Sequence, residues 1–230
     1  MSVRESLERL KKSIGDVARD SGRDPASVRL VLVTKTVSPE RIREAYDAGE
    51  RDLGENRVQE WQGKKDVLPQ DIRWHLIGHL QTNKVKYVVG KVALIHSLDR
   101  LYLAEAIERQ AMAKGVPEVP CLVQVNISGE ESKSGLEPSR VEELVSRLAA
   151  FPSIQLRGMM AIGPLTEDET RVRDCFRKIR ELRDALKEKF PQHSWDVLSM
   201  GMSSDYRIAI EEGANMLRIG SLIFPREPLT

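Results

Sequence analysis

The sequence predicts an α/β protein, a single-domain (β/α)8 TIM barrel with an extra N-terminal helix. Eight short apolar runs alternate with longer amphipathic segments, which is typical of parallel strands joined by right-handed helical crossovers. A length of 230 residues suits one barrel, and no linker, repeat or low-complexity stretch divides it. We therefore expect one domain over residues 1–230. Periodicity alone leaves a doubly wound open sheet as the alternative.

The elements follow from the hydrophobic periodicity. Val3, Leu7 and Leu10 recur at helical spacing and predict an opening helix over residues 2–20. The expected strands are 30–34, 52–54, 73–77, 93–96, 121–126, 155–160, 197–200 and 215–219. The expected helices between and after them are 39–48, 57–67, 81–89, 100–114, 139–149, 167–190 and 204–212.

The composition limits the classes of partner. A net charge of +1 gives no reason to expect a nucleic acid or an anionic membrane. Cys121 and Cys175 are too few and too far apart for a disulfide framework or a CxxC metal site, which suits a reducing compartment. No apolar run reaches the length of a membrane span. The opening helix contains Glu5, Glu8 and Asp16, whereas transit peptides are poor in acidic residues. We expect a cytoplasmic protein, and the absence of a spare apolar face favours a monomer.

The first predicted strand leads into a lysine that is a candidate for covalent chemistry. If the strand pattern continues, Val31, Val33 and Lys35 share one face. Burial beside two valines would lower the pKa of the amine and favour its neutral form, which condenses with an aldehyde. The alternative is a lysine that extends to solvent from the strand end.

The loops after the seventh and eighth strands have the features of an anion site. Ser203 lies in a turn that leads into a helix, and Gly220 and Ser221 directly follow the last strand. In barrels of this class these two loops bind phosphate, and free N–H groups at a helix start favour an anion. Closure would place the first strand beside the eighth, within reach of Lys35. A phosphate near an imine-forming lysine suggests pyridoxal 5'-phosphate (PLP) or the sugar phosphate of a class I aldolase.

Arg218 helps to separate these two ligands. It alternates with Leu217 and Ile219 on the eighth strand and can therefore point inward. A guanidinium only donates hydrogen bonds, so opposite a pyridine nitrogen it would keep that nitrogen unprotonated and weaken the ring as an electron sink. The alternative is an arginine that pairs with a carboxylate on the barrel rim.

Short motifs spread over nearly the whole chain carry a family resemblance. In order they are LVTK (32–35), LGEN (53–56), WHLIGHLQTNK (74–84), IHSLD (95–99), VNIS (125–128), KSG (133–135), GMM (158–160), LSMGMS (198–203) and RIGS (218–221). With these motifs the sequence resembles the pyridoxal phosphate homeostasis proteins, small PLP-binding barrels similar to the N-terminal domain of alanine racemase. Two residues depart from the family pattern, Arg57 where an aromatic is common and Pro225 where glycine is usual.

The resemblance implies a cofactor site and a function. The implied residues are Lys35 for a covalent PLP aldimine, Arg218 for the pyridine nitrogen, Ser203, Gly220 and Ser221 for the phosphate, and Asn56 and Met159 near the ring. The implied protein carries or buffers PLP and maintains intracellular vitamin B6 and amino-acid homeostasis without turning over a substrate. PLP-dependent apo-enzymes would be its partners.

A PLP-dependent amino-acid racemase is the alternative function. Racemisation needs a proton donor on each face of the reacting carbon. Alanine racemase uses a tyrosine supplied with the help of a further β-domain. All four tyrosines of this chain fall in helical patterns and not at strand ends, so we expect no catalytic residue.

Two further motifs allow a functional interpretation. His75 and His79 are four residues apart, but they bracket a strand-to-loop segment and not a helical turn, so we expect no shared metal. Lys133 lies in a loop rich in glycine, serine and charge, and we expect it to be exposed and mobile. A role as a second acceptor of the aldehyde is a hypothesis for this lysine.

Overall fold

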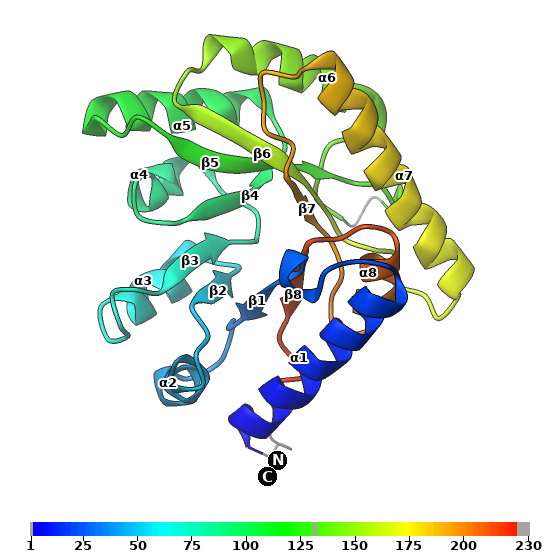
Figure 1. The fold of residues 1–230 in the computed structure, drawn as a ribbon. Helices are drawn as coiled ribbons and strands as arrows, with labels where there is room; N and C mark the ends of the chain where they lie inside the picture. The colour runs from blue at the N-terminus through cyan, green and yellow to red at the C-terminus, as the bar shows by residue number, and fades with distance from the viewer. Residues whose placement is uncertain (1, 131–132, 225–230) are drawn as a thin grey trace.

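The computed structural model describes residues 2–130 and 133–224, and these form a closed parallel barrel (Figure 1). The strands are β1 (Arg29–Val33), β2 (Asp52–Glu55), β3 (Arg73–Leu76), β4 (Leu94–Leu98), β5 (Val119–Val125), β6 (Ile154–Ala161), β7 (Val197–Ser199) and β8 (Met216–Ile219). They follow one another in chain order, and β8 pairs with β1. The predicted barrel is confirmed and the open sheet is excluded. Pro225 lies outside the described residues.

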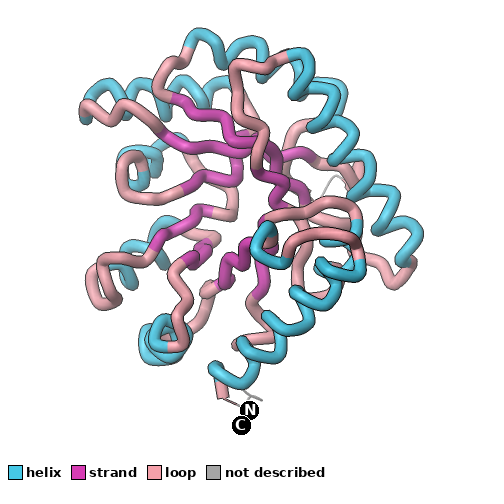
Figure 2. Tube along the Cα trace, viewed as in Figure 1, coloured by secondary structure: helices cyan, strands magenta, loops and turns pink. Residues whose placement is uncertain are grey.

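Helices form the outer layer around the strands (Figure 2). They are α1 (Val3–Asp20), α2 (Pro39–Asp47), α3 (Val58–Lys65), α4 (Val85–Val88), α5 (Leu101–Lys114), α6 (Pro138–Arg147), α7 (Glu169–Lys189) and α8 (Tyr206–Glu211), with 3-10 turns η1 (Pro25–Ser27), η2 (Thr82–Lys84) and η3 (Leu148–Ala150). The expected helix 81–89 is divided between η2 and α4. The last helix begins at Tyr206 and not at residue 204, because the preceding residues form a turn in which the Met202 N–H donates to Asp205 Oδ1 at 2.6 Å.

The predicted extra helix is confirmed as α1. Ser2 and Glu5 form a capping box in which each backbone N–H donates to the other side chain, at 2.8 and 3.2 Å. The helix contacts α2 and α8, and Figure 1 shows it beside α8. Since α8 has only six residues, α1 covers the part of the outer layer that a longer eighth helix would cover.

Two apolar clusters form the core. The larger one lies between the strands and the helices and includes Leu30 and Leu32. The smaller one takes one side chain from each of six strands and therefore fills the barrel interior; its buried members are Val31, Leu94, Leu122, Met160, Val197 and Met216. The two faces of β1 thus separate as the alternation predicts.

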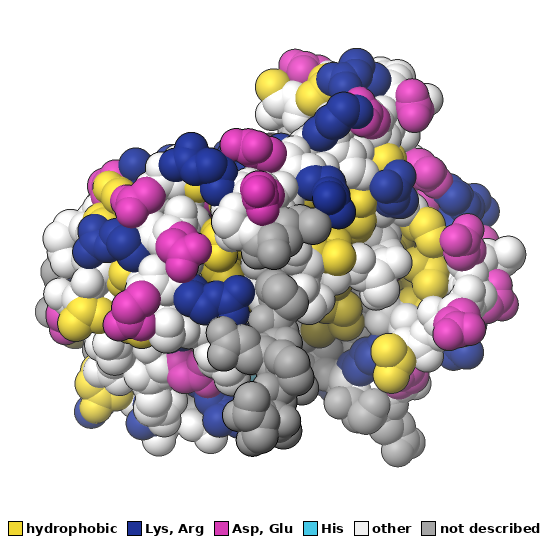
Figure 3. All heavy atoms as spheres, turned by 90° about the horizontal axis from the view of Figure 1, so that it is seen from below, with side chains coloured by type: hydrophobic (Ala, Val, Ile, Leu, Met, Phe, Trp, Pro, Cys, Tyr) yellow, Lys and Arg dark blue, Asp and Glu magenta, His cyan; other side chains and the backbone are white. Residues whose placement is uncertain are grey.

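Charges of both signs are mixed over the surface. Figure 3 shows basic and acidic side chains interspersed, with small apolar areas between them, on the face seen from below. None of the helices in the described ranges is long and apolar enough to cross a membrane. Residues 2–130 and 133–224 also contain no group of three or more His, Cys, Asp or Glu side chains that could hold a metal ion.

Gly158 sits at a bulge of β6 that only glycine can occupy. The pairing of β5 with β6 shifts register just before it, and its φ is +139°. A Cβ added there would lie 1.9 Å from the Val197 carbonyl oxygen. The bulge sets which residues of β6 face the interior beyond this point.

We expect Gly158→Ala to destabilise the protein by about 4 kcal/mol or to prevent folding, because backbone strain and a backbone clash act together. Gly63, within α3, is the matched control, since nothing lies within 4 Å of its added Cβ. Gly63→Ala should stabilise by roughly 0.5–1 kcal/mol through helix propensity. Urea unfolding followed by circular dichroism measures both changes, and comparable stabilities for the two variants would contradict the account of the bulge.

Candidate functional site

The lysine after β1 lies in a turn at the carboxyl end of the barrel. The Val37 N–H donates to the Thr34 carbonyl at 3.0 Å and closes the turn around Lys35. Lys35 is exposed, and within the described part of the chain its amine has no hydrogen-bond or ion-pair partner. The interpretation that Lys35 is buried beside two valines is wrong, and the alternative of a lysine exposed at the strand end is confirmed, because β1 ends at Val33 and a turn follows. The structure instead presents an unpaired amine.

The backbone of this turn is strained. Thr36 has a φ of +61°, an unfavourable value for a β-branched residue that costs about 1–3 kcal/mol. Its N–H donates to Glu60 Oε2 at 3.1 Å, which ties the turn to α3. These two hydrogen bonds hold the backbone on both sides of Lys35, while its side chain has no partner among the described residues.

A buried polar cluster lies directly beneath the turn. Lys64 Nζ donates to the Thr34 carbonyl and to Glu55 Oε1, both at 2.8 Å, and Thr34 Oγ1 donates to the same carboxylate oxygen at 2.6 Å. Burial raises the pKa of Glu55 although Lys64 and Thr34 act to lower it. Sequence reasoning missed this cluster, because a lysine in an amphipathic helix is normally solvated. No local signal marks Lys64 as buried.

Arg218 lies inside the barrel. Its Nη1 donates to Ser199 Oγ at 2.7 Å and its Nη2 donates to the Ala161 carbonyl at 2.8 Å. Its side chain has no carboxylate within ion-pair distance among the described residues, so the predicted inward direction is confirmed and the rim pairing is not found. Burial lowers the pKa of Arg218 to about 10, and the nearby charge of Asp205 acts in the opposite direction.

The loops after β7 and β8 present unused hydrogen-bond donors. The hydroxyls of Ser203 and Ser221, and the N–H groups of Ser203, Ser204, Gly220 and Ser221, have no partner among the described residues. A Cβ at Gly220 would lie 2.8 Å from the Val33 carbonyl oxygen, so the end of β8 packs closely on the end of β1. These unused donors and the Lys35 turn therefore share one edge of the barrel.

Asn56 and Met159 differ in where they lie. Asn56 follows β2 and lines an open pocket of about 680 Å³ together with Glu60, the residue that holds the Lys35 turn. Met159 packs in the cluster between strands and helices, while Met160 faces the barrel interior. The structure therefore does not bring the Met159 side chain together with the other implied residues, because the bulge at Gly158 and strand alternation direct it outward.

Lys133 and the two histidines of the WHLIGHLQTNK motif, His75 and His79, also have defined surroundings. Lys133 Nζ donates to the Gly163 carbonyl at 2.6 Å and to Glu130 at 3.2 Å, so the prediction of an exposed, mobile lysine is wrong. His75 is buried in the barrel, whereas His79 is half exposed and lies 3.7 Å from Asp99. The two histidines do not converge.

These residues fit PLP as a set. PLP offers an aldehyde, a pyridine nitrogen and a phosphate. Within residues 2–130 and 133–224 the structure offers an unpaired amine, a buried guanidinium without a carboxylate partner, and a group of free N–H and O–H donors. All of them belong to β1, β7 and β8 or to the turns at the carboxyl ends of these strands, which are neighbours in the closed barrel.

Comparison with known proteins assigns the chain to a family. The family model described as alanine racemase, N-terminal domain, matches residues 6–228. A pyridoxal phosphate homeostasis protein of Aquifex aeolicus is 45% identical over 225 residues, which are 97% of this chain and 98% of that protein. The chain belongs to the pyridoxal phosphate homeostasis protein family. The resemblance deduced from the motifs is thereby confirmed.

Solved structures show how near and distant relatives compare. PipY of Synechococcus elongatus, solved with PLP bound, is 34% identical with a TM-score of 0.84, over 97% of this chain and 100% of that one. Alanine racemase from Corynebacterium glutamicum is 14% identical with a TM-score of 0.70, over 97% of this chain and 62% of that one. The second likeness shows the fold alone. These two family members thus match nearly the whole length of this chain, whereas this alanine racemase is considerably longer.

We expect Lys64→Met to destabilise the protein by about 3 kcal/mol at pH 7, because it leaves the Glu55 carboxylate buried without its cation. The pKa of Glu55, already raised by burial, would rise further above the ordinary glutamate value of about 4.3, so that folding takes up a proton. The loss should therefore be smaller at pH 5 and larger at pH 8, as measured by urea unfolding.

The control is Lys65→Met, one residue further along α3. Lys65 pairs with Asp66, whose side chain is exposed, and its loss should change stability by less than about 0.5 kcal/mol at either pH. A Lys64→Met loss that is the same at pH 5 and pH 8 would show that ionisation of Glu55 does not determine the cost.

Proposed function

We propose that the protein binds PLP through a covalent link to Lys35 and carries or buffers the cofactor without turning over a substrate. The single observation that supports this most is Arg218, a guanidinium buried in the barrel whose direct partners are a hydroxyl and a carbonyl. A buried cation of this kind suits a ligand that supplies a hydrogen-bond acceptor at the same depth. Its place on the strand next to Lys35 fits PLP.

Each end of the cofactor has a proposed partner. PLP supplies an aldehyde that condenses with an amine and releases water. The unpaired Lys35 amine would hold that end, and the Thr36 turn and its bond to Glu60 keep the lysine backbone in place. Arg218 would donate to the pyridine nitrogen. Asn56 would line the entrance, from the pocket beside the Lys35 turn.

The phosphate would lie on Ser203, Gly220 and Ser221. Their hydroxyl and N–H donors are free within the described residues, and they follow the strands whose loops bind phosphate in barrels of this class. The close packing of Gly220 on Val33 leaves no room for a side chain between this loop and β1.

Two features support carriage of PLP over racemisation. A guanidinium does not give up its proton to the ring nitrogen, so it does not promote the carbanion chemistry that racemisation needs. Tyr46 and Tyr206 also direct their hydroxyls to Asp71 and Ser13 on the outer layer, at 2.7 and 2.9 Å. A role in intracellular vitamin B6 and amino-acid homeostasis follows from storage and release of PLP.

We further propose that this role is carried out by a cytoplasmic monomer that delivers PLP to apo-enzymes. The charge-balanced composition of the chain supports free diffusion over attachment to nucleic acid. In this scheme Lys133 is a candidate second acceptor of the aldehyde. Its amine is tied to Gly163 and Glu130, so it would have to leave these partners first.

We expect the purified protein with PLP to show a visible absorption band that borohydride removes, leaving a phosphopyridoxyl group on Lys35 by mass spectrometry. Lys35→Ala should abolish the band while the circular dichroism spectrum stays unchanged, because Lys35 is exposed and makes no bond within the described residues. A modified lysine elsewhere, or no band in the native protein, would refute the covalent proposal.

Incubation of the loaded protein with individual amino acids, followed by chiral analysis, tests the racemase alternative. We expect interconversion no faster than with free PLP at the same concentration. Turnover clearly above that level, and lost in Lys35→Ala, would overturn the carrier assignment.

We expect Ser203→Ala combined with Ser221→Ala to weaken PLP retention more than Arg218→Ala does. The double serine variant removes hydroxyl donors to a doubly charged phosphate. We expect this loss to raise the PLP dissociation constant about tenfold or more. Arg218→Ala should instead shift the absorption spectrum. Equilibrium dialysis and absorption spectra measure the two effects, and an unaltered dissociation constant in the serine double variant would show that the phosphate lies elsewhere.

A further inference from the structure

A chain of hydrogen bonds starts at Arg218 and crosses the barrel interior. Arg218 Nη1 lies 2.7 Å from Ser199 Oγ, which lies 3.1 Å from His96 Nδ1. His96 Nε2 lies 3.0 Å from His75 Nδ1, and His75 Nε2 lies 3.0 Å from Asp52 Oδ1. The strands β4 and β7 are not neighbours in the barrel, so the bond between His96 and Ser199 spans its lumen.

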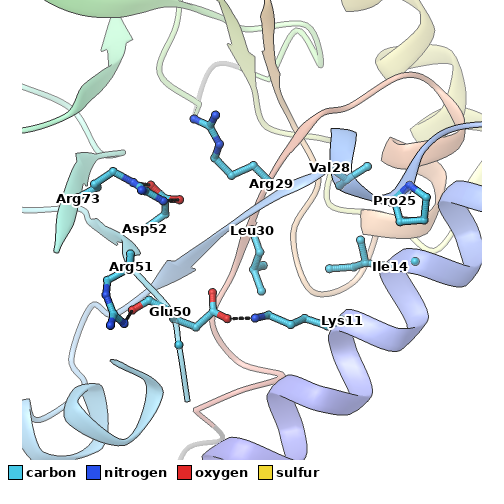
Figure 4. Close-up of a pocket in the computed structure, with 12 residues that line it drawn as sticks. Lys11, Ile14, Pro25, Val28, Arg29, Leu30, Glu50, Arg51, Asp52 and Arg73 are labelled. Atoms are coloured by element: carbon cyan, nitrogen blue, oxygen red, sulfur yellow. Dashed lines mark hydrogen bonds and ion pairs between the residues drawn. The ribbon is translucent and has the colours of Figure 1, made fainter. Parts of the chain in front are cut away.

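The chain connects the two ends of the barrel. Its five members, from Arg218 to Asp52, are all buried, with at most 6% of any residue exposed. Asp52 is the first residue of β2 and pairs with Arg73, the first residue of β3, at 2.6 Å. Figure 4 shows this pair at the wall of a cavity of about 330 Å³ at the amino end of the strands. Arg218 is near the opposite end, at the proposed cofactor site.

The direction of every hydrogen bond in the chain can be assigned. Arg218 can only donate and the Asp52 carboxylate can only accept. Burial lowers the pKa of His96 well below its ordinary value, so this ring is neutral and carries one proton. If Ser199 donates to His96 Nδ1, then His96 donates through Nε2 to His75, and His75 donates through Nε2 to Asp52. Each donor then has an acceptor.

The opposite direction leaves a group unsatisfied. If His75 carried two protons it would donate to His96, which would then donate through Nδ1 to Ser199. Ser199 Oγ would receive this bond and that of Arg218, and its own proton would have no acceptor among the described residues. A buried hydroxyl proton without an acceptor is unfavourable. Donation in the direction from Arg218 to Asp52 is therefore the more stable arrangement of these hydrogen bonds.

We propose that Ser199, His96, His75 and Asp52 are positioning residues for Arg218, which fix its guanidinium and connect its buried charge to a carboxylate at the far end of the barrel. This rests on the proposed function, in which Arg218 donates to the pyridine nitrogen. Two of its five N–H groups are held by Ser199 and Ala161, which orients the plane of the guanidinium and leaves the others for the ligand. Polarisation along the chain favours the charged form of Arg218.

The test compares Ser199→Ala and Asp52→Asn with a matched control in the loaded protein. We expect Ser199→Ala to raise the PLP dissociation constant about tenfold and Asp52→Asn about threefold. Both should shift the absorption maximum of bound PLP in the same direction as Arg218→Ala. The control is Asp196→Asn. Asp196 pairs with Arg157 at the same end of the barrel as Asp52 but is not part of the hydrogen-bond chain. This variant should leave the PLP dissociation constant within twofold and the absorption maximum unshifted.

The outcomes separate this inference from the proposed function. Arg218→Ala can alter the spectrum while Ser199→Ala and Asp52→Asn do not. The hydrogen-bond chain then has no effect on Arg218, so the inference is overturned and the proposed function stays intact. If Arg218→Ala itself changes neither spectrum nor affinity, the proposed role of Arg218 at the cofactor fails, and the inference fails with it. The inference is supported if the absorption maximum shifts in Ser199→Ala and Asp52→Asn and does not shift in Asp196→Asn.

A second measurement needs neither the cofactor nor a substitution in the hydrogen-bond chain. Nitrogen-15 NMR of histidine-labelled, PLP-free protein reports which ring nitrogen carries the proton. With His79→Gln and His193→Gln to assign the signals, we expect both His75 and His96 at pH 7.5 to be neutral with the proton on Nε2. A proton on Nδ1 of His96, or a doubly protonated ring at either position, would refute the assigned polarity even if Asp52→Asn failed to fold.

Discussion

Closure of the parallel sheet between β8 and β1 is the constraint on which the candidate site depends. The pairing of Leu32 with Ile219 brings the end of the last strand to the end of the first, although the two are almost the whole chain apart. The Lys35 turn, the Gly220 loop and Arg218 become neighbours only through this pairing. In an open sheet with β1 and β8 apart, the Lys35 amine, the Arg218 guanidinium and the donors of the Gly220 loop would not lie close together.

Two of the buried charged groups in this barrel, the Lys64–Glu55 pair and Arg218, are stabilised differently. Lys64 and Glu55 neutralise each other directly beneath the Lys35 turn. Arg218 has no carboxylate within ion-pair distance in the part of the chain that the structure describes, and its bonds go to a hydroxyl and a carbonyl. The first arrangement holds backbone in place, and the second leaves a cation with donors to spare. Desolvation of an unpaired guanidinium is costly, which makes Arg218 the residue whose surroundings most need a ligand to explain them.

The alternation of side chains along β1 predicts the strand residues correctly but not Lys35, which follows the strand. Alternation within β1 was predicted well, since Val31 faces the interior while Leu30 and Leu32 face the helices. The same alternation does not extend to Lys35, because β1 ends at Val33 and residues 34–37 form a turn. Met159 is a similar case, since the bulge at Gly158 determines which methionine faces inward. Both errors arise where backbone geometry departs from the regular repeat.

The sequence by itself determined the barrel, the order of its elements, the family, and the strand ends that carry Lys35, Ser203, Arg218 and Gly220, because these depend on periodicity and on local turn chemistry. Only the tertiary structure decided the exposure of Lys35, the burial of Lys64, and the chain from Arg218 to Asp52. The physical reason is that hydrogen bonds inside a barrel join residues of strands distant in sequence. Their distances and directions depend on closure and register, which no local pattern specifies.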